Sequence, residues 1–291
     1  MKTMFPFNVV VSLENAKWLD PAADAVRTAV KTTIRPQWLR DILHGVPLGH
    51  PLHPLLIQVP IGAWLSAAVL DLIPGTAAAS KVLVGTGLAA AVPAAISGFV
   101  DWSDTHEQQL RVGLIHSTAN VVGVGLYTTS LCERVAGRQD RGKIFGLAGL
   151  LVVGVSGFLG GHLAYRQAAG ANHAEDVPHR MQPGWHDIGP LADLVENDLT
   201  QRVVGEIPVV VLRRGSRVDV LSDVCSHLSG PLHQGELRDL GGAPCVVCPW
   251  HQSIFSMRTG EVVHGPATAP QACFQTRLSD GNVEVSLPGA G

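Results

Sequence analysis

The sequence has few cysteines and few charges, and each shortage excludes a class of protein. Five cysteines among 291 residues are too few, and odd in number, for the disulfide scaffold of a small secreted protein. Charged side chains make up 15% of the chain and leave a net charge of -3, so no basic field would attract a nucleic acid. We therefore expect a reducing compartment, no nucleic-acid partner, and thiols that either bind metal or pack in a core.

The sequence is instead rich in long apolar runs, which are concentrated before residue 166. Four runs of 19 to 22 residues carry one charged side chain between them, Asp71, and they span residues 55–73, 82–100, 112–132 and 144–165. Each run is long enough to cross a hydrocarbon core, which needs about 20 helical residues, and each lacks the polar stripe of a soluble helix. The spacing of Gly157 and Gly161 lets membrane helices approach closely. The sequence predicts an α-helical membrane bundle of four transmembrane helices over residues 55–165.

Residues 1–54 are predicted to form an N-terminal helical segment at the membrane interface. Apolar residues recur there at helical spacing, and Trp38 stands beside Arg35 and Arg40. Tryptophan and arginine are common where a membrane meets water. An ordinary cap on the helix bundle is the alternative interpretation of the same pattern.

The histidines before residue 166 are predicted to lie on one side of the membrane. With four spans, odd helices begin and even helices end on the side of the C-terminal domain, and six histidines fall at those ends: His44, His50, His53, His106, His116 and His162. Ionisable groups inside a membrane are costly and face the bundle interior or a cavity. His53, His116 and His162 are therefore candidate ligands for a haem, another metal or a quinone, with interhelical hydrogen bonding as the structural alternative. Asn120, one turn after His116, is the expected hydrogen-bond partner in each case.

The character of the chain changes in its C-terminal third. Residues 166–184 are polar, contain glycine and proline and have no periodicity, which predicts a linker. Residues 185–288 hold short β-rich segments, such as 207–213 and 217–221 around the turn Arg214-Gly215-Ser216. The sequence thus predicts an all-β sandwich after the membrane bundle.

Two short motifs in this third have the spacing of metal ligands. They read C-S-H at 225–227 and C-P-W-H at 248–251, and 20 residues separate them. Each motif supplies one thiolate and one imidazole. Such a set suits either one zinc ion or a [2Fe–2S] cluster with two thiolates on one iron and two imidazoles on the other. Cys132, Cys245 and Cys273 are interpreted as core residues, since they lie in apolar or strand-like surroundings.

Taken with their neighbours, the two motifs resemble the Rieske ferredoxin family over about residues 183–288. The neighbouring segments are LSGPL at 228–232, QSIF at 252–255, Thr259-Gly260 and Gly265-Pro266-Ala267. The resemblance implies a [2Fe–2S] cluster held by Cys225, His227, Cys248 and His251, with the Gly-Pro segment as a third loop that shields it. A zinc site would not require the Thr-Gly and Gly-Pro-Ala segments.

Departures from the family bear on the reduction potential. The extra loop cysteines of quinol-oxidising Rieske proteins are replaced by Gly230 and Trp250, and their tyrosine by Phe255, although Ser253 is present. Fewer hydrogen bonds to the cluster sulfurs lower the potential, so we expect a midpoint of roughly -150 to +100 mV. Gln252 stands where the family usually has glycine.

A second resemblance covers residues 45–170. The segments GHPLHP at 49–54, GFVDW at 98–102 and GFLGGHLAYR at 157–166 are similar to a bacterial four-helix membrane family of unknown function. The position of His162 is more often acidic in that family. This resemblance implies a membrane bundle and no particular activity.

These features predict a membrane-anchored Rieske iron–sulfur protein that carries single electrons between a redox partner and the membrane. The sequence does not name the electron donor or the electron acceptor. The expected partners are the lipid bilayer and a membrane oxidoreductase. A redox-sensing Rieske domain that regulates the bundle is the alternative. A Rieske oxygenase is disfavoured, because its second iron needs a large additional domain for which no soluble length remains. The pattern favours an electron carrier or an oxidoreductase subunit over a stand-alone enzyme.

The expected location is the cell membrane, with the Rieske domain in the cytoplasm. Lysine and arginine are nearly balanced between the loops of the two faces, so the positive-inside rule does not choose a side. A cluster-bearing domain is loaded before export and then needs a twin-arginine signal at the N-terminus. The arginine pair of this sequence is Arg213-Arg214, which lies inside the domain.

Overall fold

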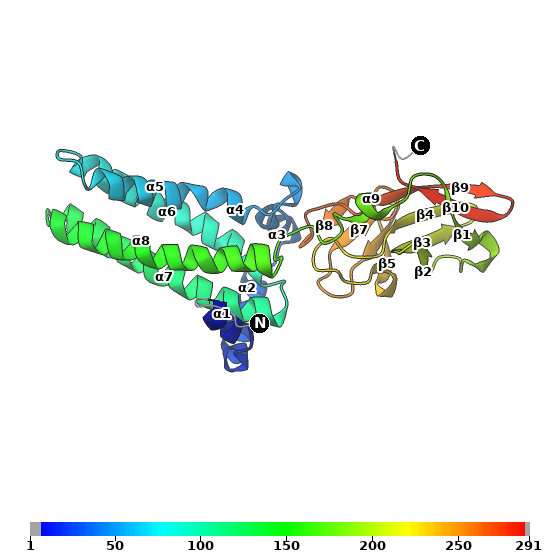
Figure 1. The fold of residues 1–291 in the computed structure, drawn as a ribbon, viewed down its shortest axis with the longest axis horizontal. Helices are drawn as coiled ribbons and strands as arrows, with labels where there is room; N and C mark the ends of the chain where they lie inside the picture. The colour runs from blue at the N-terminus through cyan, green and yellow to red at the C-terminus, as the bar shows by residue number, and fades with distance from the viewer. Residues whose placement is uncertain (1–6, 289–291) are drawn as a thin grey trace. The chain divides into compact units, whose positions relative to one another are not determined.

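The computed structural model describes residues 7–288, and these residues belong to two compact units. One unit comprises residues up to 35 together with 51–169, and the other comprises residues 36–50 together with those from 170 onward. Figure 1 shows that helices build the first unit and that strands dominate the second. The chain therefore passes from one unit to the other three times, after residues 35, 50 and 169.

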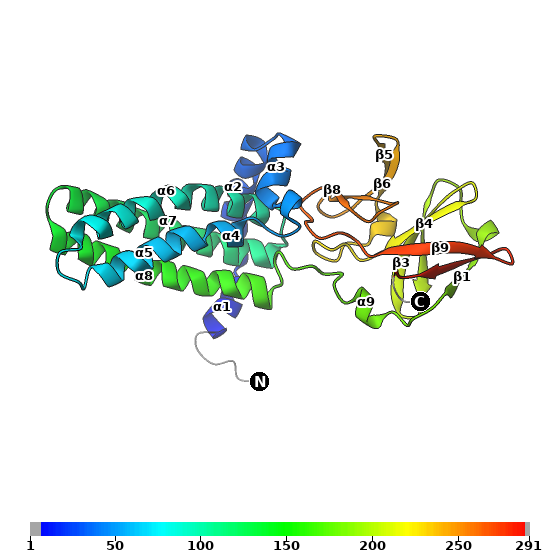
Figure 2. The same ribbon diagram turned by 90° about the horizontal axis from the view of Figure 1, so that it is seen from above.

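Long helices lie side by side in the first unit (Figures 1 and 2). The helices are α1 (Phe7–Glu14), α2 (Asp20–Thr33), α4 (His53–Leu56), α5 (Gln58–Leu70), α6 (Ala77–Trp102), α7 (Glu107–Val135) and α8 (Gln139–Gly161). Helix α5 packs on α6, α7 packs on α8, and α6 contacts α7. The N-terminal helices α1 and α2 both contact α7.

Among the described residues, three segments of this unit are long and apolar enough to cross a membrane: His53–Leu70, Ala77–Trp102 and Gln139–Arg166. They correspond to the first, second and fourth predicted runs. The third run lies in α7, which has 29 residues but more polar side chains. Thr118 and Thr128 donate hydrogen bonds to carbonyls one turn earlier, at 2.7 and 2.8 Å, so their hydroxyls are satisfied within the helix. Helix α7 thus departs from the prediction in composition and not in length.

The core of the helical unit lies between α5, α6 and α7. Trp64 and Tyr127 stack with ring centroids 4.1 Å apart, and Ala67 and Val84 pack in the same cluster. Gly87 leaves room for the indole, because a Cβ at this position would lie 2.2 Å from Trp64 Nε1. The close approach of α5 and α6 therefore requires glycine at position 87.

A buried ion pair closes one end of the helical unit. Arg134 Nη1 and Nη2 donate to the two carboxylate oxygens of Asp71 at 2.8 and 2.5 Å, and the two side chains are 1% and 10% exposed. The same guanidinium donates to the hydroxyls of Ser80 and Ser130 at 3.0 and 3.1 Å. The one acidic residue of the predicted runs is therefore neutralised by an arginine of α7.

Within residues 7–288, the strands of the second unit form two antiparallel sheets. A six-stranded sheet has the order β1-β10-β9-β4-β3-β2, and a four-stranded sheet has the order β5-β6-β7-β8. The strands are β1 (His186–Pro190), β2 (Leu199–Val204), β3 (Ile207–Arg214), β4 (Arg217–Ser222), β5 (Glu236–Leu240), β6 (Ala243–Val247), β7 (Ile254–Ser256), β8 (Val262–His264), β9 (Cys273–Ser279) and β10 (Asn282–Ser286). This part of the chain is therefore β-rich, as predicted, with two short 3-10 turns at Leu191–Asp193 and Leu232–Gln234.

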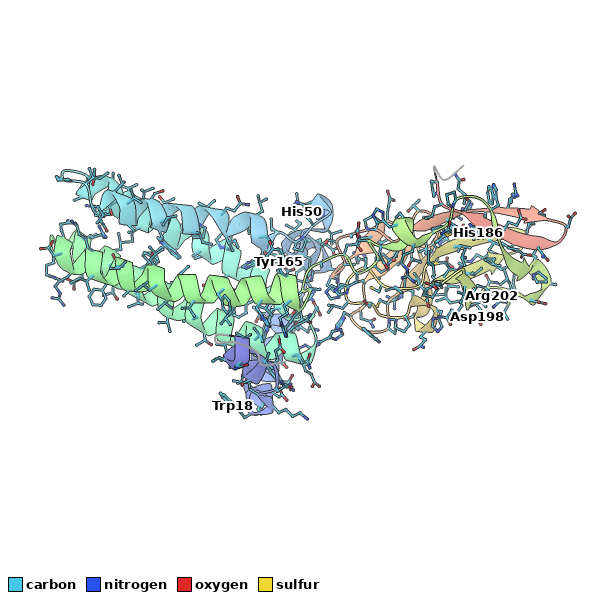
Figure 3. The ribbon with its side chains drawn as sticks, viewed as in Figure 1. Trp18, His50, Tyr165, His186, Asp198 and Arg202 are labelled. Carbon is cyan, nitrogen blue, oxygen red and sulfur yellow. The ribbon has the colours of Figure 1, made fainter. Side chains whose placement is uncertain are left out.

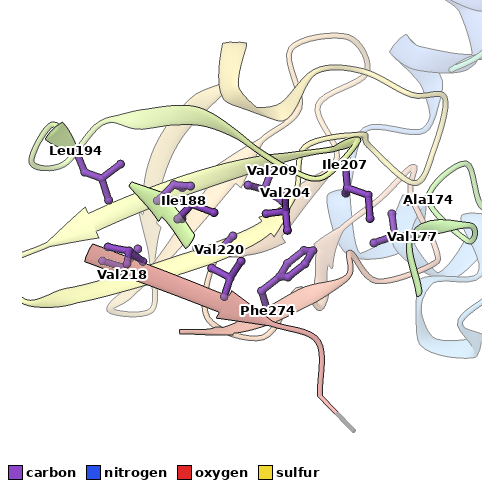
Figure 4. Close-up of a cluster of buried hydrophobic side chains, with 13 residues drawn as sticks. Ala174, Val177, Ile188, Leu194, Val204, Ile207, Val209, Val218, Val220 and Phe274 are labelled. Carbon is purple, nitrogen blue, oxygen red and sulfur yellow. The ribbon is translucent and has the colours of Figure 1, made fainter. Parts of the chain in front are cut away.

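Successive side chains of a strand point to opposite faces of the sheet, and the apolar side chains on one face of the larger sheet form one of the cores of this unit (Figure 4). Val211 of β3 pairs with Val220 of β4, and both are 1% exposed beside Phe274 of β9. The predicted turn between β3 and β4 is present, with Gly215 at a φ of +64°. A second core contains the predicted thiol ligands together with Phe255 and Met257.

Two segments outside the predicted β-domain also belong to the second unit. Helix α3 (Gln37–His44) and a 3-10 turn, Val46–Leu48, come from residues 36–50. The predicted linker contains the short helix α9 (Val177–Arg180). Ala174 and Val177 are 5% and 4% exposed within the core of the larger sheet (Figure 4). Burial of these two side chains holds the middle of the linker against the sheet.

Candidate metal centre

The four predicted ligands lie in two loops. Cys225 and His227 follow β4, whereas Cys248 and His251 lie between β6 and β7. Backbone hydrogen bonds close both loops: Cys225 N–H donates to Gly230 O at 2.9 Å, and Cys248 N–H donates to the carbonyl two residues beyond His251, that of Ser253, at 2.8 Å. Each loop therefore fixes one sulfur and one imidazole at the end of a buried strand.

The two loops meet at their thiols. Cys225 and Cys248 are each 1% exposed. Gly230 of the first loop lies against the second thiol, since a Cβ at position 230 would be 2.8 Å from Cys248 Sγ. The rings of His227 and His251 are half-buried, with centroids 5.1 Å apart and an interplanar angle of 86°. The structure thus pairs the thiols inside the domain and the imidazoles closer to solvent.

The two thiols also change each other's pKa. A hydrogen bond with Cys225 lowers the pKa of the Cys248 thiol to about 7, although burial acts in the opposite direction. The same hydrogen bond, together with burial, raises the pKa of Cys225 well above its ordinary range. One sulfur of the pair therefore ionises near neutral pH, and the other requires the positive charge of a metal before it does.

A third loop covers both ligand loops. Ala267 N–H donates to Ser253 Oγ, next to the second ligand loop, at 2.9 Å. Ser226, between the ligands of the first loop, donates its hydroxyl to Ala269 O at 2.7 Å. Ala267 is 1% exposed and packs in the core that contains both thiols. The predicted third loop is therefore joined to each of the other two.

Sequence reasoning missed residues that support the first ligand loop. His173 N–H donates to Ser226 O at 2.9 Å, and the imidazole Nδ1 of His173 lies 3.2 Å from Ser229 Oγ. Asp223, two residues before the first thiol, is 2% exposed and accepts a hydrogen bond from His233 N–H at 2.7 Å. Asp223 could have been noticed in the sequence, because it is an acidic residue directly after a strand of mostly apolar residues. No pattern in the sequence around His173 predicts its contact with the first ligand loop.

Comparison with known proteins places this site in a family. Residues 184–275 match the model of the Rieske [2Fe-2S] domain, and residues 49–173 match a family described as predicted membrane protein (DUF2231). The anthranilate 1,2-dioxygenase ferredoxin subunit of Burkholderia cepacia is 35% identical over 103 residues, which are 92% of that protein and 35% of this chain. The chain belongs to the Rieske family.

Two further proteins are similar to about a third of this chain. A human Rieske domain-containing protein is 28% identical over 114 residues, which cover 34% of this chain and 73% of that protein. The ferredoxin of carbazole 1,9a-dioxygenase from Nocardioides aromaticivorans is a solved structure with 24% identity and a TM-score of 0.33, covering 36% of this chain and 98% of its own.

The residues of the Rieske domain fit the [2Fe–2S] cluster that the family implies. Such a cluster needs two thiolates for one iron and two imidazoles for the other. The paired thiols and the paired imidazoles supply these donors in two separate groups. Glycine at position 230 keeps the space beside Cys248 Sγ open, which a side chain would fill.

The second ligand loop contains a strained residue at the position where the Rieske family usually has glycine. Gln252 has a φ of +65°, in the left-handed region where glycine carries no penalty. We expect Gln252→Gly to raise the free energy of unfolding of the Rieske domain by about 0.5 to 1 kcal/mol. Chemical denaturation followed by the circular dichroism of the sheets would measure this. A loss of stability would contradict the strain at this position.

Two of the three predicted membrane-side ligands lie together. The rings of His53 and His116 have centroids 6.5 Å apart. Their Nδ1 atoms each lie 2.8 Å from a backbone carbonyl oxygen, that of Ala94 for His53 and that of Ser156 for His116. Because a carbonyl only accepts, Nδ1 carries the proton in both rings. Asn120 Nδ2 lies 3.2 Å from His116 Nε2, as predicted.

The third residue, His162, has a different partner. Its Nε2 lies 2.6 Å from Glu14 Oε1, and the two side chains are 3% and 16% exposed. His162 begins a turn of π-helix, His162–Arg166, at the end of α8. The contact joins α1 to the π-helical turn that follows α8 and accounts for the burial of the imidazole.

Proposed function

We propose that the protein is a membrane-anchored electron carrier, which exchanges single electrons between a redox partner and the membrane. Cys225 and Cys248 bind one iron of its cluster, and His227 and His251 bind the other. The observation that carries this proposal is the separate pairing of buried thiols and half-buried imidazoles in two adjoining loops. When bound, a cluster with two neutral imidazoles carries less negative charge than one with four thiolates and accepts an electron more easily.

The residues of the Rieske domain provide the conditions for this exchange. Phe255 and Met257 are fully buried in the core behind the thiols and exclude water from that side. His227 and His251 are half-buried, so a partner approaches the site past their rings. Phe255 has no hydroxyl to donate toward the cluster sulfurs, which favours a low reduction potential.

We propose that the helical unit crosses the membrane four times, with α7 as the third span. Three membrane-length helices support this, and α7 packs against both α6 and α8. Trp18 and Tyr165 are 75% and 93% exposed, as suits aromatic side chains at a membrane interface (Figure 3). Four spans put both ends of the described chain on one side, which we place in the cytoplasm.

The partners follow from the relatives and from the bundle. One relative is a ferredoxin subunit of a dioxygenase, so a redox enzyme is the expected partner of this Rieske domain. Within the membrane, His53 and His116 are the proposed site for a haem or a quinone that exchanges electrons with the cluster. A neighbouring membrane oxidoreductase is the alternative partner on that side.

A reductive titration of detergent-extracted full-length protein tests the proposal. We expect iron and inorganic sulfide in equal amounts, broad absorption bands that bleach on reduction, and a midpoint of roughly -150 to +100 mV. Zinc in place of iron would overturn the cluster assignment, and a midpoint above this window would overturn the argument from Phe255. A redox-dependent change in the bundle without electron passage to a quinone or membrane acceptor would support a sensing role instead.

A further inference from the structure

A helix from the N-terminal part of the chain holds the third loop of the Rieske domain. Asp41 of α3 accepts a hydrogen bond from Gly265 N–H at Oδ1, with a distance of 3.0 Å. Its other oxygen, Oδ2, lies 2.9 Å from His264 Nδ1, which must donate because a carboxylate only accepts. The side chains of Asp41 and His264 are 13% and 37% exposed, so the carboxylate is largely shielded from water and the imidazole is partly open to it.

The backbone of the third loop packs closely against α3 and the turn that follows it. A Cβ at position 265 would lie 3.1 Å from Val46 Cγ2 and 3.3 Å from His44 Cδ2. His44 is 1% exposed. Glycine at position 265 therefore permits the approach that brings its N–H to the carboxylate of Asp41.

The loop that Asp41 holds is joined to both ligand loops. Two residues after Gly265, Ala267 donates to Ser253 Oγ, and Ala269 accepts from Ser226 Oγ. A displacement at Gly265 is thus transmitted to the segments that carry the four predicted ligands. Asp41 lies 224 residues before Gly265, so this support comes from outside the sequence of the Rieske domain.

We propose that α3 supports the metal centre of the Rieske domain and that Asp41 is a positioning residue for the third loop. The inference rests on the proposed function in one respect, namely that a cluster is bound between the ligand loops. Asp41 fixes the third loop over the cluster, which slows cluster loss and limits the access of small reagents. The match to the Rieske domain covers residues 184–275, so α3 lies outside the segment that this chain shares with the family.

The test compares Asp41→Ala and Asp41→Asn with Asp24→Ala in the full-length protein. Asp24 is an exposed residue of α2 and controls for the loss of a carboxylate. With an iron chelator in excess, we expect the rate of cluster loss to rise about ten- to a hundredfold in Asp41→Ala, because the two hydrogen bonds that join the carboxylate to the third loop disappear, together with the one from Gln37 Nε2 at 2.9 Å within α3. Asp41→Asn should show a smaller rise, since its amide oxygen still accepts from Gly265. Asp24→Ala should match the wild type.

Two further readouts separate positioning from a general loss of stability. Hydrogen exchange at Gly265 N–H should accelerate in Asp41→Ala, while amides of the sheet β1-β10-β9-β4-β3-β2 stay protected. The midpoint potential, measured by EPR-monitored titration, should shift in Asp41→Ala and not in Asp24→Ala. If Asp41→Ala does not fold, the test uses Asp41→Asn and the hydrogen-exchange rate of the Gly265 amide in the wild-type protein. A Gly265 amide that exchanges without protection in the wild type would overturn the proposal.

The outcomes distinguish this inference from the proposed function. A wild-type protein without a Rieske spectrum would overturn the proposed function. A wild-type Rieske spectrum with identical chelator, exchange and potential results for Asp41→Ala and Asp24→Ala would overturn the positioning role alone.

Discussion

Full-length protein carrying Cys248→Ser is expected to purify without the absorption bands of the [2Fe–2S] cluster, whereas Cys245→Ala retains them. The hydrogen bond with Cys225 lowers the pKa of the Cys248 thiol to about 7, which makes it the first of the pair to ionise. A serine hydroxyl does not ionise near neutral pH and is a poor ligand for iron, so we expect essentially complete loss of iron and sulfide. Absorption spectra and iron and sulfide analysis measure the difference.

Cys245 is a matched control because it is equally buried and only three residues away. It lies in β6, its Sγ is 3.6 Å from Ala243 O, and burial raises the pKa of its thiol. Its removal is expected to reduce the free energy of unfolding by about 1 kcal/mol and to leave the spectrum unchanged. A normal spectrum in Cys248→Ser, or loss of iron in Cys245→Ala, would contradict the ligand assignment. The second result would point to a C-x-x-C site that contains both residues.

Local patterns in the sequence were sufficient to predict the long apolar helices and the β-rich C-terminal part, and they grouped the proposed ligands into two loops. The C-x-H and C-x-x-H motifs each act within one loop, so spacing alone brings Cys225 near His227 and Cys248 near His251. The apolar runs likewise fix their own helices, because helical hydrogen bonds join residues four apart. These predictions needed no knowledge of which element packs on which.

The residues that hold the site and the helices in place could not be predicted, because they contact residues that are distant in the sequence. Asp41 is a polar residue on an amphipathic helix, a pattern that equally fits exposure to solvent. His162 was predicted as a cofactor ligand from its depth, but its partner Glu14 lies 148 residues earlier. Ala174 and Val177 are too few and too close to produce a periodicity, although their burial orders the linker.

The largest loss of stability is expected from Arg134→Met in the helical unit. Arg134 is 1% exposed and forms the paired hydrogen bonds with Asp71, with additional bonds to Ser80 and Ser130. Removing one partner of a buried pair leaves the other charge without compensation, which costs about 3 to 5 kcal/mol. Unfolding of the detergent-solubilised protein in a denaturing detergent, followed by helical circular dichroism, measures this change.

Two further variants show whether the loss comes from the uncompensated charge. Arg141→Met removes an exposed arginine whose Nε is 3.5 Å from Glu133, so it is expected to cost about 0 to 1 kcal/mol. The double variant Asp71→Asn with Arg134→Met leaves no charge in the cluster and should recover at least half of the stability that Arg134→Met loses. An Arg134→Met protein as stable as Arg141→Met would mean that the pair is not needed. A double variant less stable than Arg134→Met would assign the cost to lost packing, because the methionine would then fail to fill the space between α5 and α7.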